Sequence, residues 1–442
     1  MTDNNSQNLE EFAICYESTP GTAETEPQVW MLVTDNSGAI NVVRKFDNRR
    51  TSGTRDNITS IPHGYHTEST LEVFGLPTAN GLGQFLTGAL GADSATVDPS
   101  GGNVAVHVIT PSNTLPSWTV WAKNQVIEQK TWGCQVNRLT LNSPQDEVVT
   151  FSVDLVGMDI NSGVDDGNFA NASYANTSTI CAAFTSKDCT VTFLDSGSNL
   201  RNTMTDFSAT FDNGITVDEG ITHGSVTPRD IIAGDREVSG SMTFWDDDAD
   251  ILKAFWSGGD SDPTATKPAE CPSLCALTLD WQSSDIEKVI GDETYTNNVS
   301  NQAGDLTAAG TYTGTGNTNF NVKILDDAAD PEVFQWSTDD GGNWSANVTI
   351  DNTGTHTLQN GVTVAFANNS GYSNGDEWSF TAYDYKNKLT LAIPKVRLTN
   401  LRPERGGNRL GATVDWTAIK QNSSANICTF TLVSGDTTEY DA

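Results

Sequence analysis

Histidine and cysteine are the side chains of this chain that metal or redox chemistry would use first. His63 and His66 lie three residues apart in HGYH, but no acidic or cysteine cluster follows them. Neither close cysteine pair has the C-x-x-C spacing of zinc and redox sites. We therefore expect free thiols and no bound metal, with a disulfide inside either pair as the alternative. The close pairs are Cys181 with Cys189 and Cys271 with Cys275.

Two further motifs have both a chemical and a structural interpretation. The acidic run DDDAD at 246–250 lacks the ligand spacing of a calcium-binding loop, and it suits the start of a helix better. The single RGG in ERGGNRLG at 404–411 lies between alternating residues, which predicts a hairpin loop rather than a nucleic-acid segment. No Ser-His-Asp order, phosphate-binding loop or carboxylate pair stands out, so we expect no enzyme activity and no cofactor.

The charge of the chain restricts its partners. Its 442 residues carry 57 Asp and Glu against 24 Lys and Arg, a formal net charge of −33. Such a chain repels nucleic acid at long range, and this excludes a protein that grips phosphates through clustered basic residues. Three interpretations remain: a protein that faces DNA without gripping it, adaptation to high salt, or an acidic surface that only aids solubility.

Targeting signals are missing from the pattern. The opening MTDNNSQNLEEF lacks the basic start and apolar stretch of a signal peptide. No apolar run approaches the roughly 20 residues of a membrane helix. We expect synthesis in a cytoplasm and no membrane anchor.

The elements that would position functional residues occur twice. In the second copy, apolar residues at 238–244 alternate with polar ones and predict a strand. A short helix should follow it and end at Gly258 and Gly259. In the first copy a strand should end near Phe74, Asn80 can cap a helix, and Gly91 should close it. The apolar stripe of that first helix is Leu82, Phe85, Leu86 and Leu90.

The correspondence continues downstream and fixes the predicted domains. Residues 118–125 correspond to 277–284, and the hairpin at 134–158 corresponds to the one at 394–418. Residues Val149, Phe151, Val153 and Leu155 should point inward in the first hairpin, as should Leu410, Ala412, Val414 and Trp416 in the second. The predicted division is an arm at 1–11, a first β unit at 12–160, a linker at 161–184, a second β unit at 185–287 plus 386–442, and an insert at 288–385.

The insert has a different pattern from the two units. Turn signals such as DDGG, QNG and SNGD recur every 8–12 residues between short alternating runs. This spacing predicts a separate β-sandwich, inserted at a hairpin whose two ends leave close together.

The order of these motifs resembles the tail-tube proteins of long-tailed, siphovirus-type viruses. The resemblance rests on CYESTPGTAETEPQVWMLV, HVITPSNTLPSWTVWAKN, DREVSGSMTFWDDDADILKAFW and LTLAIPKVRL, among other stretches. It implies a mainly β fold with two tandem tail-tube β-barrel or sandwich units, each with a short flanking helix. The insert resembles Ig-like sandwiches of virion proteins. The acidity suggests a halophilic host.

The resemblance also implies a function. Sheets would join across subunits into rings, and the rings would stack into a hollow tail tube that conducts the genome during ejection. Two units per chain imply three chains per pseudo-hexameric ring. Expected partners are further copies, the tape-measure, terminator and distal tail proteins, and passing double-stranded DNA without specific binding. The virion tail is the expected location. The alternative is a surface adhesin or carbohydrate-binding protein of tandem β-sandwiches.

Two sets of residues are candidates for roles in such a tube. The tripeptide Phe-Asp-Asn occurs at 46–48 and 211–213, where it would begin a loop that reaches the adjacent ring; an Asx turn at a strand end is the alternative. Charges near these loops would pair between stacked rings or, alternatively, remain solvated. They are Arg49, Arg50 and Arg55 in the first loop and Asp218 and Glu219 in the second.

The channel wall is the second candidate. DNA must slide through it, so the wall should repel phosphate rather than bind it. The polar faces of the predicted strands supply acidic residues for this wall; the competing explanation spreads the acidity evenly over the exterior for life in salt. The lumen candidates are Glu68, Glu72, Asp154, Glu237 and Asp415.

Overall fold

The fold was analysed in a computed structural model of the chain. The structure describes residues 11–31, 33–34, 40–50, 57–77, 81–97, 104–123, 127–162, 183–193, 204–217, 220–245, 255–256, 267, 274–297, 306–326, 331–351, 354–368, 370–406 and 409–441. The fold is mainly β, as predicted, with long antiparallel sheets and one helix of several turns in the described part.

The first half of the chain forms an antiparallel array in the order β2-β1-β8-β9-β10-β4-β3. Strand β9 is long enough to pair with β8 at its beginning and with β10 at its end. The strands are β1 (Glu11–Tyr16), β2 (Val29–Met31), β3 (Asn41–Arg50), β4 (Asn57–Phe74), β8 (Trp118–Lys123), β9 (Glu128–Ser143) and β10 (Thr150–Gly157).

The second half repeats this order as β12-β15-β23-β24-β14-β13. Both copies carry a bulge at the equivalent place. In the first copy it interrupts the β9–β10 pairing between Asp154 and Leu155 of β10. In the second copy it interrupts the β23–β24 pairing between Leu398 and Asn400 of β23. The duplication is therefore present in the pairing pattern as well as in the residue pattern. The strands are β12 (Cys189–Phe193), β13 (Met204–Asp212), β14 (Glu237–Trp245), β15 (Cys275–Ile290), β23 (Glu377–Gly406) and β24 (Arg409–Ala418).

The two copies are fused rather than merely tethered. Strand β9 of the first copy pairs with β13 of the second, and β25 of the second pairs with β7 of the first. Buried residues of both copies form one connected core. The two fused copies form the body of the molecule. Its other elements are β5 (Gly91–Ala92), β6 (Ala95–Val97), β7 (Ala105–Pro111), β11 (Asp159–Ser162), β25 (Thr429–Ser434) and the 3-10 turn η4 (Ser186–Asp188).

Helix α1 (Leu82–Leu90) forms where its apolar stripe predicts a helix, and it buries almost every residue against the sheets. Gly81 occupies the N-cap position, so the expectation of Asn80 as the cap is wrong. Gly91 follows the helix with φ of 115°, a conformation that glycine adopts readily. Of the helix predicted after DDDAD, only Phe255 and Trp256 are described, and both are helical.

The inward-pointing positions predicted for the two hairpins are confirmed where they are described. Val149, Phe151 and Val153 are fully buried, as is Val414. The hairpin predicted around RGG is confirmed too, because Gly406 pairs with Arg409. The side chain of Leu410 lies outside the described residues.

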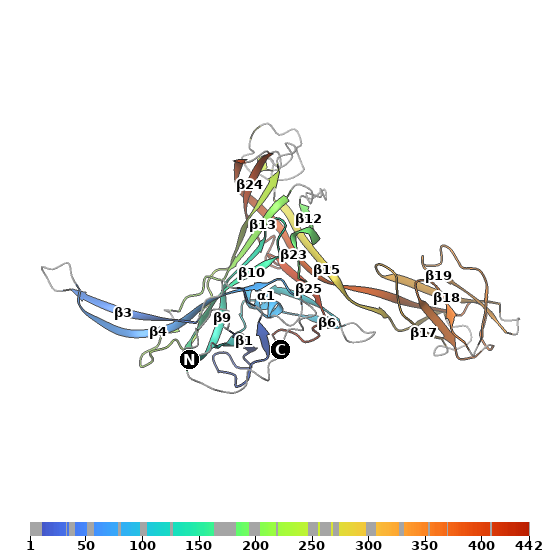
Figure 1. Ribbon diagram of the computed structural model, residues 1–442, viewed down its shortest axis with the longest axis horizontal. Helices are drawn as coiled ribbons and strands as arrows, with labels where there is room; N and C mark the ends of the chain where they lie inside the picture. Colours follow the sequence, from blue (N-terminus) through green and yellow to red (C-terminus); the bar gives the residue numbers. More distant parts are fainter. Residues whose placement is uncertain are drawn as a thin grey trace, which may run out of the picture.

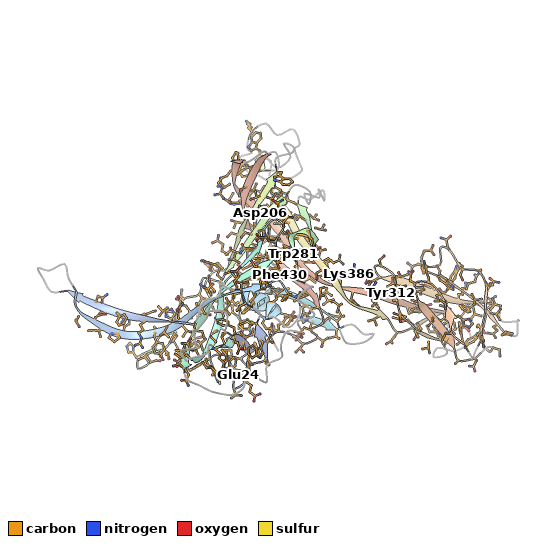
Figure 2. All side chains as sticks on the ribbon, in the orientation of Figure 1. Glu24, Asp206, Trp281, Tyr312, Lys386 and Phe430 are labelled. Atoms are coloured by element: carbon orange, nitrogen blue, oxygen red, sulfur yellow. The ribbon has the colours of Figure 1, made fainter. Side chains whose placement is uncertain are left out.

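Residues 291–384 form a lobe with a hydrophobic core of its own. A two-stranded ribbon of β15 and β23 joins it to the body, and β23 runs without interruption from one to the other (Figure 1). Figure 2 shows Trp281 and Phe430 in the body, Lys386 on the ribbon and Tyr312 in the lobe. The strands are β16 (Thr294–Asn297), β17 (Leu306–Gly310), β18 (Thr318–Asp326), β19 (Val333–Ser337), β20 (Val348–Thr349), β21 (His356–Thr357) and β22 (Val362–Phe366).

Candidate functional site: a polar sheet face and two open edges

The main sheet of the body runs in the order β3-β4-β10-β9-β13-β14-β24-β23 and so crosses both copies. One of its faces is a continuous polar surface. Residues opposite each other in neighbouring strands share a face, so the register defines rows across the sheet. One row is Glu72, Ser152, Thr140, Thr210, Ser239, Thr417 and Arg397. A second is Thr70, Asp154, Arg138, Asp212 and Glu237. A third is Asn142, Ser208, Ser241, Asp415 and Asn400.

The opposite face of the same strands is apolar and buried. The row behind the first polar row is Val73, Phe151, Leu141, Ala209, Gly240, Trp416 and Leu398. Because side chains alternate along a strand, core packing on one side fixes which residues reach the polar face. The sequence therefore specifies this face through its period of two.

Hydrogen bonds join residues that lie opposite each other on neighbouring strands of the polar face. Thr70 donates to Asp154 Oδ1 at 2.7 Å, and Ser208 donates to Asn142 Oδ1 at 3.2 Å. The hydroxyl oxygens of Thr243 and Thr413 are 3.1 Å apart. These hydroxyl and amide side chains are short, and the hydrogen bonds between them hold them in fixed orientations on the sheet.

Two arginines are held against this face by acidic neighbours. Arg138 donates to Asp212 Oδ2 through Nε at 3.1 Å and Nη2 at 2.8 Å. Burial would raise the pKa of Asp212, but the hydrogen bonds from Arg138 and the Gly214 N–H outweigh it and lower the pKa. Arg402 donates to Asp415 Oδ1 at 2.6 Å. Each arginine is thus partly neutralised by a carboxylate.

All five acidic residues named as lumen candidates lie on this face. Glu72, Asp154, Glu237 and Asp415 belong to the rows above, and Glu68 lies two residues before Thr70 on β4. Asp212, Arg138 and Arg402 also lie on this face and were not among the predicted residues, although each stands at an alternate position of a strand pattern in the sequence. Which side of an assembly this face occupies stays a prediction.

The structure describes only some of the charged residues that were predicted to lie in the two loops. The backbones of Arg49 and Arg50 lie in β3, paired with Thr59 and Asn57, so placing them in a loop was wrong. Strands β3 and β4 continue beyond the body as a long two-stranded arm, seen on the left in Figure 1. Arg55, Asp218 and Glu219 lie outside the described residues, and their proposed pairing stays a prediction.

The two Phe-Asp-Asn tripeptides are not equivalent in the fold. Phe46 and Asp47 lie inside β3 and pair with Pro62 and Ile61, so this tripeptide does not begin a loop. The register of the sheet instead makes Val42 the counterpart of Phe211. Val42 pairs with Thr67 of β4, and Phe211 pairs with Val238 of β14. Thr67 and Val238 each lie four residues before an equivalent core residue, which is Leu71 in β4 and Met242 in β14. The repeated tripeptide is therefore a local coincidence, whereas the repeated strands are real.

The second tripeptide joins the two copies. Asn213 is buried and donates through Nδ2 to the carbonyls of Val136 and Ala89 at 2.9 and 3.1 Å. Arg236 Nε donates to Asn213 Oδ1 at 3.0 Å, and its Nη2 donates to the carbonyl of Leu90 at 2.9 Å, at the end of α1. A cation is favourable at a helix C-terminus, so this contact fixes one copy to the other.

Two edges of the body's main sheet lack a strand partner among the described strands. At the first copy's end, β3 pairs only with β4. At the second copy's end, β23 beyond Leu398 pairs only with β24. Val42 on the first edge has 41% of its surface exposed, whereas its counterpart Phe211 is fully buried in the β9–β13 ladder. An open edge of this kind invites another strand.

The described residues hold no cluster that could bind a metal ion. No group of three or more His, Cys, Asp or Glu in this part of the chain has metal-ligand geometry. His66 instead contacts its neighbour Glu68 at 2.9 Å. Five cysteines are described, and all are buried. Cys15, Cys134 and Cys428 are free thiols, and the other two are Cys189 and Cys275.

Among the described residues, no helix is both long and apolar enough to span a bilayer.

The chain was compared with models of known protein families and with curated proteins. A family model described as phage tail tube protein matches residues 8–418. No curated protein matches the chain. The matched range includes the first copy of the β unit, the lobe, and the second copy as far as the end of β24.

Proposed function

The chain belongs to the phage tail tube protein family, and from this premise we propose that it is a non-enzymatic subunit that forms three-chain rings by joining sheets edge to edge. The rings stack into the tail tube of a long-tailed, siphovirus-type virus and conduct its DNA during ejection. Residues 12–160 would be one ring unit, residues 185–287 with 386–442 the second, and residues 288–385 an Ig-like insert. Other copies of the chain are the principal partners, and tape-measure, terminator and distal tail proteins are expected at the ends.

The observation that carries this proposal is the β9–β13 ladder inside the chain. It joins the second half of β9, the edge of the four-stranded sheet β3-β4-β10-β9, to β13, the opposite edge of the equivalent sheet β13-β14-β24-β23. The two strands left at the ends of the joined sheet, β23 and β3, are the equivalents of β9 and β13. Repeating the internal joint between chains closes a six-unit ring with three copies, and it removes both open edges.

The internal joint also predicts the register of the external one. Phe211 pairs with Leu139, and Asp212 pairs with Arg138. The matching bulges make Leu401 the counterpart of Leu139. Val42 of one copy should therefore pair with Leu401 of the next, and this pairing would cover the exposed Val42 side chain.

A disulfide experiment tests this register. The double variant Val42→Cys with Leu401→Cys should, after mild oxidation of assembled protein, give covalent species that end at three chains on a denaturing gel. The control pairs Val42→Cys with Arg402→Cys, whose side chains would point to opposite faces. Equal cross-linking of both pairs, or a closed species of six chains, would refute the proposed ring.

The polar face is the proposed channel wall. Its acidic residues outnumber its arginines, and carboxylates repel the phosphates of a passing duplex. Imaging of assembled tubes at side-chain resolution tests this: Glu72, Asp154 and Asp415 should face the lumen. A lumen lined mainly by Lys and Arg would contradict it. A neutral lumen inside an acidic outer wall would favour adaptation to a saline host as the cause of the acidity.

The β3–β4 arm is the proposed contact between stacked rings. Phe46 and Ile61 on opposite faces of this ribbon have 48% and 51% of their surface exposed. Apolar side chains on a projecting arm suit burial against a neighbouring ring. The double change Phe46→Ser with Ile61→Ser should give rings that fail to stack, whereas Leu325→Ser, an exposed apolar change in the lobe, should leave tube length unaltered. Full-length tubes from the double variant would exclude this role for the arm.

A further inference from the structure

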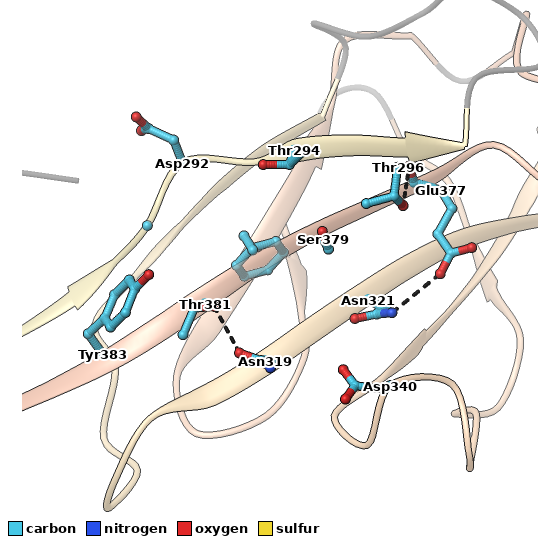
Figure 3. A pocket seen from close by; sticks show the side chains of 12 residues that line it. Asp292, Thr294, Thr296, Asn319, Asn321, Asp340, Glu377, Ser379, Thr381 and Tyr383 are labelled. Atoms are coloured by element: carbon cyan, nitrogen blue, oxygen red, sulfur yellow. Dashed lines mark hydrogen bonds between the residues drawn. The ribbon is translucent and has the colours of Figure 1, made fainter. Parts of the chain in front are cut away.

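The lobe at 291–384 carries an open groove that the tube function does not use. It has a volume of about 630 Å³, within the usual range of small-ligand sites. The groove lies over strands β16, β23 and β18 (Figure 3). Its polar side chains include Thr294, Asn319, Asn321, Glu377, Thr381 and Tyr383.

The floor of the groove is fixed by the core beneath it. Along β23, Glu377, Ser379 and Thr381 face the groove, and the intervening Trp378 and Phe380 are buried in the lobe core. These core rings pack closely: Phe380 is stacked on Phe320 with centroids 5.3 Å apart. The groove side chains therefore project from a rigid sheet.

Hydrogen bonds orient the two amides of the floor. Thr381 Oγ1 donates to Asn319 Oδ1 at 2.8 Å, and Asn321 Nδ2 donates to Glu377 Oε1 at 3.3 Å (Figure 3). Each bond uses one atom of an amide that has both donors and an acceptor. The Nδ2 group of Asn319 and the Oδ1 of Asn321 keep their capacity for a ligand, which gives a donor and an acceptor on one surface.

The charge of the groove limits the ligand. Asp292, Asp340 and Glu377 contribute carboxylates, and no lysine or arginine is among the described lining residues. An anionic ligand such as a nucleotide or an acidic sugar would be repelled by these carboxylates. A neutral ligand rich in hydroxyl groups can instead donate to the carboxylates and exchange bonds with the amides.

An aromatic platform lies at one end. Tyr383 lines the groove, and its ring is stacked on Tyr385 with centroids 5.1 Å apart and an angle of 10°. The stacking holds the Tyr383 ring in a fixed orientation, and this ring is a flat apolar surface beside a polar one. The C–H face of a pyranose ring suits the first surface, and its hydroxyl groups suit the second.

We propose that this groove binds a neutral oligosaccharide. The inference goes beyond the structural role in the tube, because the lobe has its own core and the groove shares no residue with the polar face or the open edges. Tyr383 supplies the stacking surface. Asn319, Asn321 and Glu377 supply the hydrogen bonds.

A glycan array with the full-length protein tests this inference. The probes are defined neutral oligosaccharides of glucose, mannose, galactose, rhamnose and N-acetylglucosamine, alongside uronic-acid and sialylated ones. Binding should be confined to neutral probes. Asn321→Ala and Tyr383→Ala, made separately, should each weaken the best probe at least tenfold in titration calorimetry. The control Thr307→Ala, an exposed change on the lobe's other sheet, should leave binding unaltered.

Several results would overturn the inference. They are the absence of binding to every neutral probe, a preference for acidic glycans, or unchanged affinity in both groove variants. Thermal melting and tube imaging of each variant show whether the protein remains folded and assembled. Because the groove is separate from the ring edges, glycan binding and tube assembly can each fail without the other.

Discussion

Buried polar side chains in the body are held by specific sets of partners, and these sets make single residues decisive. Glu17 is fully buried, and its carboxylate accepts bonds from the Gly21 and Gly133 N–H groups and from the Ser117 and Thr119 hydroxyls. All four distances are between 2.7 and 3.0 Å. A carboxylate is the side chain that can accept at all these positions.

Replacing this carboxylate by an amide should destabilise the fold. In Glu17→Gln one oxygen becomes an NH₂ group that faces donors, and we expect a loss of about 3 kcal/mol in the free energy of unfolding. Urea denaturation measures it, with the exposed Glu26→Gln as the matched control. If Glu17→Gln lost less free energy of unfolding than Glu26→Gln, the four hydrogen bonds would contribute little to stability.

His107 predicts a pH dependence of the joint between the two units. Its Nδ1 lies 2.7 Å from Asp93 Oδ2, and its Nε2 lies 2.8 Å from the carbonyl of Asp436 near the C-terminus. A carboxylate and a carbonyl both accept, so both nitrogens donate and the ring is an imidazolium. Burial alone would lower the pKa of His107, but the bonds to Asp93 and Asp436 outweigh it and raise the pKa.

The raised pKa sets the direction of the effect. The protonated His107 side chain contributes fully to stability below the pKa of about 6.5 that histidine has in the unfolded chain. This contribution is lost as the pH rises through the higher pKa of His107 in the folded protein. The melting temperature of the wild type minus that of His107→Gln should therefore fall as pH rises from 6 toward 9. A difference that is constant with pH, or that grows, would contradict the imidazolium assignment.

At the scale of elements, close packing between strands constrains the sheet as strongly as hydrogen bonding. Gly240 lies on the buried face of β14, opposite Trp416 of β24. A Cβ at this position would come within 2.1 Å of the Ser208 carbonyl oxygen and 2.6 Å of Trp416 Cζ2. Trp416 cannot easily retreat, because it is stacked on Phe207 at 5.9 Å.

The smallest possible enlargement should thus be costly. Gly240→Ala should lower the free energy of unfolding by about 2 kcal/mol, because strands β13, β14 and β24 must separate locally. Calorimetric melting compares it with Ser239→Ala on the polar face of the same strand. Equal stability of the two variants would mean that the sheet adjusts without strain.

At the scale of the whole molecule, the separate core of the lobe predicts that the body can form without it. We propose that the lobe projects from the outer wall of the tube, since a folded sandwich would obstruct a channel that passes DNA. Deleting 290–384 with a short Gly/Ser join removes the lobe core and keeps the body core intact. The strands that enter the lobe remain paired at Asp285 and Lys386.

The shortened chain should still assemble into tubes with the same repeat in negative-stain images. A matched chain with the same Gly/Ser linker inserted after residue 289, and nothing removed, controls for disruption of the ribbon. If the deletion abolishes assembly while the control forms tubes, the lobe is part of the ring contact and its proposed place outside the wall is wrong.

The sequence by itself determined the local elements and the existence of the duplication. The period of two set the buried positions Phe151, Val153 and Val414, and the stripe around Phe85 set helix α1. These features follow from backbone geometry, because alternation along a strand and the helical turn depend only on neighbouring residues. The five acidic lumen candidates came to one face for the same reason.

Only the tertiary structure decided which strands meet and in what register. The tripeptide Phe-Asp-Asn suggested an equivalence that the pairing of Phe46 with Pro62 excludes. The β9–β13 ladder joins residues about 70 positions apart, and nothing local to Leu139 or Phe211 specifies the other. Such pairings depend on which edges remain open after each unit has formed, and this is a property of the folded chain rather than of any one segment.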